Sequence, residues 1–195
     1  MKRGSLLLMG VLSVACQEKG STSASEPGAA NSGAAAAQAP AAAASPTSLL
    51  TVGAAAPALE VKAHNGEVVD LTKLRGKPVV VYFYPKDDTP GCTVEAQGIR
   101  DDWSEFTKLN AVVIGVSTDD NESHKAFAEK HELPFLLLPD KDGAIAKAFG
   151  VSLTLGYAKR VSFVIDKAGK ISKVFPNVTP KGHAKELAAA IAAAG

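Results

Sequence analysis

The segment Tyr84–Glu95 combines residue types that could make a cysteine reactive. Cys92 stands three residues after Thr89, directly behind a Pro90-Gly91 turn, and a helix is predicted to begin there. In the first turn of a helix, unpaired backbone N–H groups and the positive end of the helix dipole stabilise a thiolate. The thiolate is the form of cysteine that acts as a nucleophile. The segment therefore points to a nucleophilic thiol.

Position alone leaves two interpretations of Cys92 open. A lone cysteine is often a small buried hydrophobe without chemistry. A catalytic thiol needs a lowered pKa, since a pKa of about 8.5 leaves only a few per cent thiolate at pH 7 and one near 6 leaves roughly nine-tenths. Helix position by itself does not decide between the two.

The rest of the composition excludes several classes of function. The 195-residue chain has a net charge of +1 and lacks a basic stretch with interleaved aromatic residues, which argues against nucleic acid as a partner. His124, His131 and His183 are not spaced like a metal site. A glycine-rich phosphate or dinucleotide loop is also missing from the sequence. We therefore expect neither a metal nor another cofactor.

The elements that would position Cys92 alternate between strands and helices. Residues 78–84 form a continuous apolar, β-branched run, as expected for a strand buried on both faces. The other predicted strands are residues 58–62, 68–71, 111–117, 135–138, 160–166 and 171–175, and the predicted helices are 92–108, 123–131, 144–149 and 181–193. This alternation indicates an α/β layer architecture. Cys92 would follow the carboxyl end of a buried strand, where sites in α/β sheets collect.

The first 15 residues are typical of a secretory signal peptide. Lys2 and Arg3 precede an apolar run over residues 6–14 that is too short to span a bilayer as a helix. Leu12–Cys16 resembles the bacterial lipobox, in which the cysteine becomes the lipidated first residue of the mature protein. We therefore expect lipid attachment at Cys16. The alternative, an ordinary signal peptide with an incidental cysteine, remains open.

Residues 16–48 carry the predicted lipid-attachment cysteine and then mainly Ala, Ser, Gly and Pro. Such a segment has almost no large apolar side chain to bury and cannot offset its ordering entropy. We predict a disordered tether there, followed by a single folded domain over residues 49–195.

The spacing Pro85-x-x-x-Thr89-x-x-Cys92 resembles the active-site signature of the peroxiredoxins. The longer string over residues 83–95 is similar to the Q-type branch, also called bacterioferritin comigratory proteins. The likeness continues in Gly115–Ser117, Phe135, Gly156–Arg160, Phe163–Asp166 and Gly182–Ala184. It implies a thioredoxin-like fold with a central mixed β-sheet flanked by helices, and a thiol-dependent peroxidase activity.

The resemblance also implies roles for individual residues. Cys92 corresponds to the peroxidatic cysteine, which attacks a peroxide and becomes a sulfenic acid. Thr89 matches the threonine that bonds the thiolate, Pro85 the proline that shields the site, and Arg160 the arginine that stabilises the thiolate. A nearby cation lowers the pKa of a thiol, which agrees with that role. Without the resemblance, Thr89 reads as a helix cap and Arg160 as a surface residue. For Glu95 we predict a helix-capping role.

The sequence departs from the resemblance at one position. Many Q-type relatives carry a resolving cysteine five residues after the first, where this chain has Gln97, and Cys92 is the only cysteine of residues 49–195. We therefore expect one-cysteine operation, with an external small thiol or a thioredoxin-like protein as reductant. The expected substrates are hydrogen peroxide and organic hydroperoxides.

The lipobox-like segment places this activity on the periplasmic side of the cell envelope, in antioxidant defence, with the outer membrane favoured. Two other functions stay open at this point. One is a non-enzymatic envelope lipoprotein, because a fold alone does not fix a function. The other is a thioredoxin-like disulfide reductase, which would normally need a Cys-x-x-Cys pair.

Overall fold

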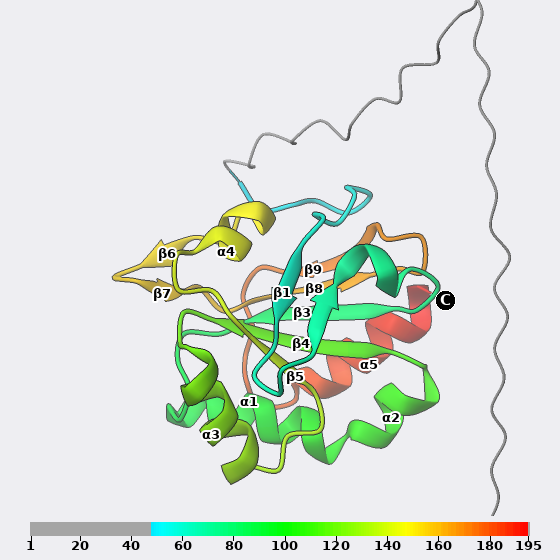
Figure 1. Cartoon of the computed structure of the whole chain (residues 1–195). Coiled ribbons are helices and arrows are strands. Elements are labelled where there is room, and N and C mark those ends of the chain that lie inside the picture. The colour runs from blue at the N-terminus through cyan, green and yellow to red at the C-terminus, as the bar shows by residue number, and fades with distance from the viewer. Residues whose placement is uncertain (1–47, 195) are drawn as a thin grey trace, which may run out of the picture. The chain divides into compact units, whose positions relative to one another are not determined.

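The structure is a computed structural model and describes residues 48–194 (Figure 1). The predicted signal peptide over residues 1–15, Cys16 and the rest of the predicted tether up to residue 47 lie outside the described residues. Among residues 48–194, no helix has both the length and the apolar character needed to cross a membrane.

A five-stranded sheet in the order β5-β4-β3-β8-β9 forms the centre of the fold. Its strands are β3 (Val79–Phe83), β4 (Val112–Ser117), β5 (Leu136–Pro139), β8 (Val161–Ile165) and β9 (Ile171–Phe175). β3, β4 and β5 run parallel to one another, whereas β8 is antiparallel to both β3 and β9. The predicted central mixed sheet is confirmed.

Helices cover both faces of this sheet (Figure 1). Within residues 48–194, the α-helices are α1 (Pro90–Asp101), α2 (Trp103–Lys108), α3 (Asn121–Lys130), α4 (Ala144–Phe149) and α5 (His183–Ala194). α1, α2, α3 and α5 share one apolar core with one face of the sheet. α4 packs on the opposite face, together with the short strands β1 (Glu60–Lys62) and β2 (Val68–Asp70) and the 3₁₀ helix at Leu71–Leu74.

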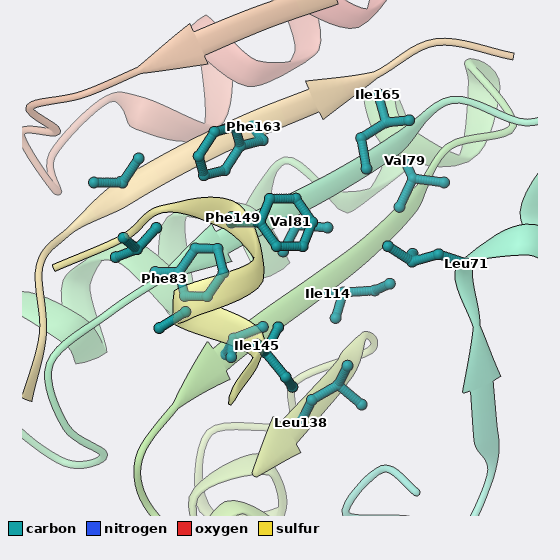
Figure 2. Close-up of a cluster of buried hydrophobic side chains, with 14 of the residues drawn as sticks. Leu71, Val79, Val81, Phe83, Ile114, Leu138, Ile145, Phe149, Phe163 and Ile165 are labelled. Carbon is teal, nitrogen blue, oxygen red and sulfur yellow. The ribbon is translucent and has the colours of Figure 1, made fainter. Parts of the chain in front are cut away.

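The strand β3 is buried on both faces because its side chains alternate between these two cores. Val79, Val81 and Phe83 belong to the core beneath α4, and Val80 and Tyr82 to the core beneath α1. Figure 2 shows the ring of Phe83 close to those of Phe149 and Phe163 in the first of these cores. Burial on both sides explains the uninterrupted apolar run in the sequence, and it fixes the strand from which the Cys92 segment departs.

The helix that carries Cys92 differs from the sequence-based prediction. The helix predicted over residues 92–108 begins earlier, at Pro90, because proline is favoured in the first helical turn. It is also broken at Asp102 into α1 and α2, and the turn allows the Trp103 ring to pack against Phe135, with ring centroids 6.0 Å apart.

The prediction also missed a small hairpin, β6 (Leu153–Thr154) paired with β7 (Tyr157–Ala158). Both residues of its turn have positive φ angles, 52° at Leu155 and 83° at Gly156. Leucine is an unusual residue at a position where asparagine, aspartate or glycine is favoured, so the usual turn signal was absent from the sequence.

Candidate active site

Cys92 lies in the first turn of α1, in the connection that leaves the carboxyl end of β3. Thr89 is the N-cap residue, and Pro90 occupies the start of the helix. The cysteine is buried, with 1% of its surface exposed. Its sulfur therefore lies near the positive end of the helix dipole, which favours negative charge, and is largely removed from bulk water.

Arg160 contacts this sulfur from a distant part of the chain. It precedes β8, whose register pairs Val161 with Phe83 at the end of β3, so Arg160 comes level with the start of the Cys92 connection. Its Nη2 donates a hydrogen bond to Cys92 Sγ over 3.1 Å. A Cβ atom at Gly91 would lie 3.4 Å from Arg160 Nη2, so the glycine leaves the guanidinium room to approach. A cation held against the sulfur favours its thiolate form.

Glu95 provides the second contact of this guanidinium. It stands three residues after Cys92, on the same face of α1, and its Oε2 accepts a hydrogen bond from Arg160 Nη1. The capping role predicted for Glu95 is therefore wrong. The helical spacing from Cys92 was the signal that could have placed its carboxylate beside the arginine.

Burial and neighbouring charges shift the pKa values of Glu95 and Arg160. Desolvation raises the pKa of Glu95 to about 7, although the nearby charge of Arg160 opposes the shift. The other oxygen of Glu95, Oε1, is buried without a hydrogen-bond partner among the described residues. Burial also disfavours the charge of Arg160, yet the adjacent Glu95 and Cys92 raise its pKa above the ordinary value.

Thr89 and Pro85 lie in the segment before Cys92, but neither donates a hydrogen bond to its sulfur as Arg160 does. The Thr89 hydroxyl donates to the Lys86 carbonyl over 3.0 Å, which closes the turn before α1, and its side chain does not cap the helix. Pro85 is half-buried at the end of β3. The structure thus brings Cys92 and Arg160 into direct contact and places Thr89 in the adjoining turn.

Gln97 occupies the position at which many Q-type relatives carry a resolving cysteine. Its Nε2 lies 3.3 Å from His131 Nδ1, so this residue links α1 to the end of α3. No group of three or more His, Cys, Asp or Glu side chains that could hold a metal occurs within residues 48–194.

The sequence of residues 52–174 matches the AhpC/TSA family. The chain belongs to this family. A peroxiredoxin Bcp from Bacillus subtilis is 46% identical over 144 residues, covering 70% of this chain and 92% of the relative. A putative peroxiredoxin Bcp from Coxiella burnetii is 42% identical over 145 residues, covering 71% and 96%. These similarities make the chain a peroxiredoxin of the Bcp or Q type, a thiol-dependent peroxidase.

Solved structures agree with this assignment. Peroxidoxin BcpB from Mycobacterium tuberculosis superposes with a TM-score of 0.68 at 35% identity, covering 73% of this chain and 96% of that one. A bacterioferritin comigratory protein from Xanthomonas campestris, described for its alkyl peroxide reduction activity, gives 0.68 at 32% identity, with 73% and 98% covered. The predicted thioredoxin-like fold of this peroxiredoxin is confirmed.

The raised pKa of Glu95 predicts how stability changes with pH. Between the ordinary value of 4.5 and about 7, the unfolded chain has released the Glu95 proton while the folded chain retains it. The unfolded state binds fewer protons in this range, so Glu95 lowers the free energy of unfolding as pH rises. Glu95→Gln removes this contribution. From pH 5 to pH 8, we expect the wild type to lose about 2–3 kcal/mol relative to the variant.

Urea unfolding of both proteins at pH 5 and pH 8 measures the effect. The substitution also alters the hydrogen bond with Arg160 at either pH, so the change of stability with pH is the quantity to compare. Parallel changes in the two proteins would contradict the prediction.

Proposed function

We propose that this peroxiredoxin reduces hydrogen peroxide and organic hydroperoxides through a sulfenic acid at Cys92, in antioxidant defence and redox homeostasis of the cell envelope. The observation that carries the proposal is the hydrogen bond from Arg160 Nη2 to Cys92 Sγ. It gives the sulfur a cationic partner at a helix start, the arrangement that a nucleophilic thiolate needs. The alkyl peroxide activity described for the Xanthomonas campestris relative supports organic hydroperoxides as substrates.

The proposed reaction begins with attack of the Cys92 thiolate on one peroxide oxygen. A sulfur–oxygen bond forms as the oxygen–oxygen bond breaks, and the other oxygen leaves as water or an alcohol after gaining a proton. Cysteine is oxidised to sulfenic acid while the peroxide is reduced. Arg160 lies within reach of the leaving oxygen's developing negative charge because it already contacts the attacking sulfur.

An external thiol completes the cycle. Cys16 and Cys92 are the only cysteines of the sequence, and Gln97 stands where many Q-type relatives have a second cysteine. One thiol of the reductant condenses with the sulfenic acid and releases water, which leaves a mixed disulfide. A second thiol then attacks that disulfide and frees Cys92 as a thiol. A small thiol or a thioredoxin-like protein fits this role.

The proposal extends to where the enzyme acts. The signal-like residues 1–15 and the lipobox-like segment ending at Cys16 support export and lipid attachment. Residues 16–48 would then tether the folded domain to the membrane on its periplasmic side, with the outer membrane favoured. Stable anchoring requires at least two acyl chains, which a lipoprotein-type modification of Cys16 would supply.

Substitutions at the two central residues test the chemistry. In a Cys16→Ser background, so that thiol reactions report on Cys92, we expect Cys92→Ser to abolish peroxide reduction with the fold retained. Arg160→Ala should slow the reaction with hydrogen peroxide by about 10²–10³-fold, because a donor to the developing charge is lost. Stopped-flow measurement of the second-order rate constant checks both.

Lys159→Ala is the matched control for the arginine variant. It removes an exposed cation next to Arg160 and should leave the rate unchanged. Turnover that persists in Cys92→Ser would disprove the proposed nucleophile. Equal losses in the two cation variants would show that general charge, rather than contact with the sulfur, is responsible.

The location is tested by Cys16→Ser in the full chain. Wild-type protein should incorporate a labelled fatty acid and sediment with membranes, whereas the variant should remain unlabelled and appear in the soluble fraction. Its rate with hydrogen peroxide should match that of the wild type, because Cys16 takes no part in the chemistry. A wild-type protein without label would refute lipid attachment at this residue.

A further inference from the structure

The turn between β3 and α1 is held by contacts with α3 at both ends of that helix. Ser123 and His124, in its first turn, bind Asp87, whereas Lys130 and His131, at its end, bind Asp88. These two aspartates lie between Pro85 and Thr89, and the proposed chemistry assigns neither of them a role. The buried one of the two aspartates, Asp87, is therefore a candidate for a role in the reaction.

Asp87 is held by side chains from three parts of the chain. The residue is 6% exposed. Its Oδ1 accepts from the Tyr84 hydroxyl over 2.7 Å. Its Oδ2 accepts from the Ser123 hydroxyl over 2.7 Å and lies 2.9 Å from His124 Nδ1. The Asp87 backbone N–H donates to Asp119 Oδ2 over 2.9 Å, so the loop that follows β4 holds the main chain as well.

His124 is fully buried and bridges two acceptors. Its Nε2 lies 3.1 Å from the Leu138 carbonyl, which can only accept, so this nitrogen carries a hydrogen. Its Nδ1 faces the Asp87 carboxylate, which already accepts two hydroxyl hydrogens. The ring therefore links the Leu138 carbonyl of β5 to the Asp87 carboxylate in the turn before Cys92.

Stability alone is a weak explanation for such a pair. Replacing both partners of a buried hydrogen-bonded pair with apolar residues of the same shape can be nearly neutral or stabilising, because the desolvation of the polar groups offsets the hydrogen bonds that they make. A buried pair with several hydrogen bonds does, however, fix the position of the chain that carries it. Here that chain is the turn that leads directly to Cys92.

The turn between β3 and α1, which Asp87 helps to hold in place, also carries Thr89. Thr89 follows Asp87 by two residues, and its hydroxyl donates to the carbonyl of Lys86, the residue before Asp87. Asp88, between them, adopts a φ of 56°, a left-handed conformation that aspartate adopts more readily than most residues with a side chain. Its carboxylate is held by Lys130 Nζ at 2.9 Å and His131 Nε2 at 3.0 Å. Contacts from α3 therefore maintain the shape of this turn.

We propose that Asp87 and His124 are positioning residues for the peroxide reaction. The pair fixes the turn so that Thr89 and Cys92 meet the peroxide in a reactive arrangement with Arg160. The inference rests on the proposed function, since it concerns the same thiol and the same peroxide. A displacement of about 1 Å in such an arrangement can reduce a rate by roughly 10²-fold.

The test compares two reactions of Cys92 in Asp87→Asn, His124→Gln and the double variant, each in the full chain with Cys16→Ser. The reaction with hydrogen peroxide depends on the arrangement of all the groups around the oxygen. Alkylation by iodoacetamide depends mainly on access to the sulfur and its thiolate content. We expect each single variant to lose about 10–100-fold in the peroxide rate while the alkylation rate stays close to that of the parent.

Because the two residues act as one unit, the double variant should be no slower with peroxide than the slower single variant. Glu129→Gln is the matched control, since it removes an exposed charge from α3 away from the turn. Its peroxide rate should equal the parent's. Peroxide rates equal to the parent's in the folded single variants, or losses that multiply in the double variant, would overturn the proposal.

Two milder substitutions keep the test valid if Asp87→Asn or His124→Gln does not fold. Tyr84→Phe and Ser123→Ala each remove one hydroxyl that donates to Asp87, and each should lower the peroxide rate selectively. An unchanged peroxide rate in both would overturn the proposal in the same way. A parent that reacts no faster than free cysteine would instead refute the proposed function, so the two failures are distinguishable.

Discussion

The site depends on the contact between the guanidinium of Arg160 and the sulfur of Cys92. A thiolate at a nearly fully buried position is costly unless a cation or hydrogen-bond donors compensate for lost water. Arg160 supplies both to Cys92, but its other amino group is engaged by Glu95. The two acidic groups therefore share one cation. Because the pKa of Glu95 is raised to about 7, the balance between them changes near neutral pH, where a peroxidase has to work.

The sheet makes this contact possible between residues 68 positions apart in the chain. β3 delivers Cys92 through the turn at its carboxyl end, and the antiparallel β8 begins beside the same end, so that Arg160 arrives at the sulfur. The parallel neighbour β4 ends at this edge as well, and Asp119 after it binds the main chain of Asp87. The rigid, doubly buried β3 is the common reference for all of these groups.

Local patterns in the sequence were sufficient to predict the main elements and to place Cys92 in the first turn of a helix. The continuous apolar run before Pro85 and the Pro90-Gly91 turn predict a buried strand followed by a helix, as observed. The helical spacing of Glu95 from Cys92 could have placed its carboxylate near the sulfur, but its residue type did not identify its partner, because capping and a contact across the fold require the same residue type at that position. The His124–Asp87 contact was missed for a related reason. It joins residues 37 positions apart, and a lone histidine on a helix carries no sign of its partner.

The most direct test of this account is to identify the first product. Reduced protein carrying Cys16→Ser would be mixed with an equimolar amount of hydrogen peroxide in the presence of dimedone, which traps sulfenic acids, and then analysed by mass spectrometry. The account predicts rapid loss of peroxide and a single dimedone adduct, located on Cys92. Peroxide that persists while Cys92 remains a free thiol would contradict it, since the contact with Arg160 would then fail to produce a reactive thiolate.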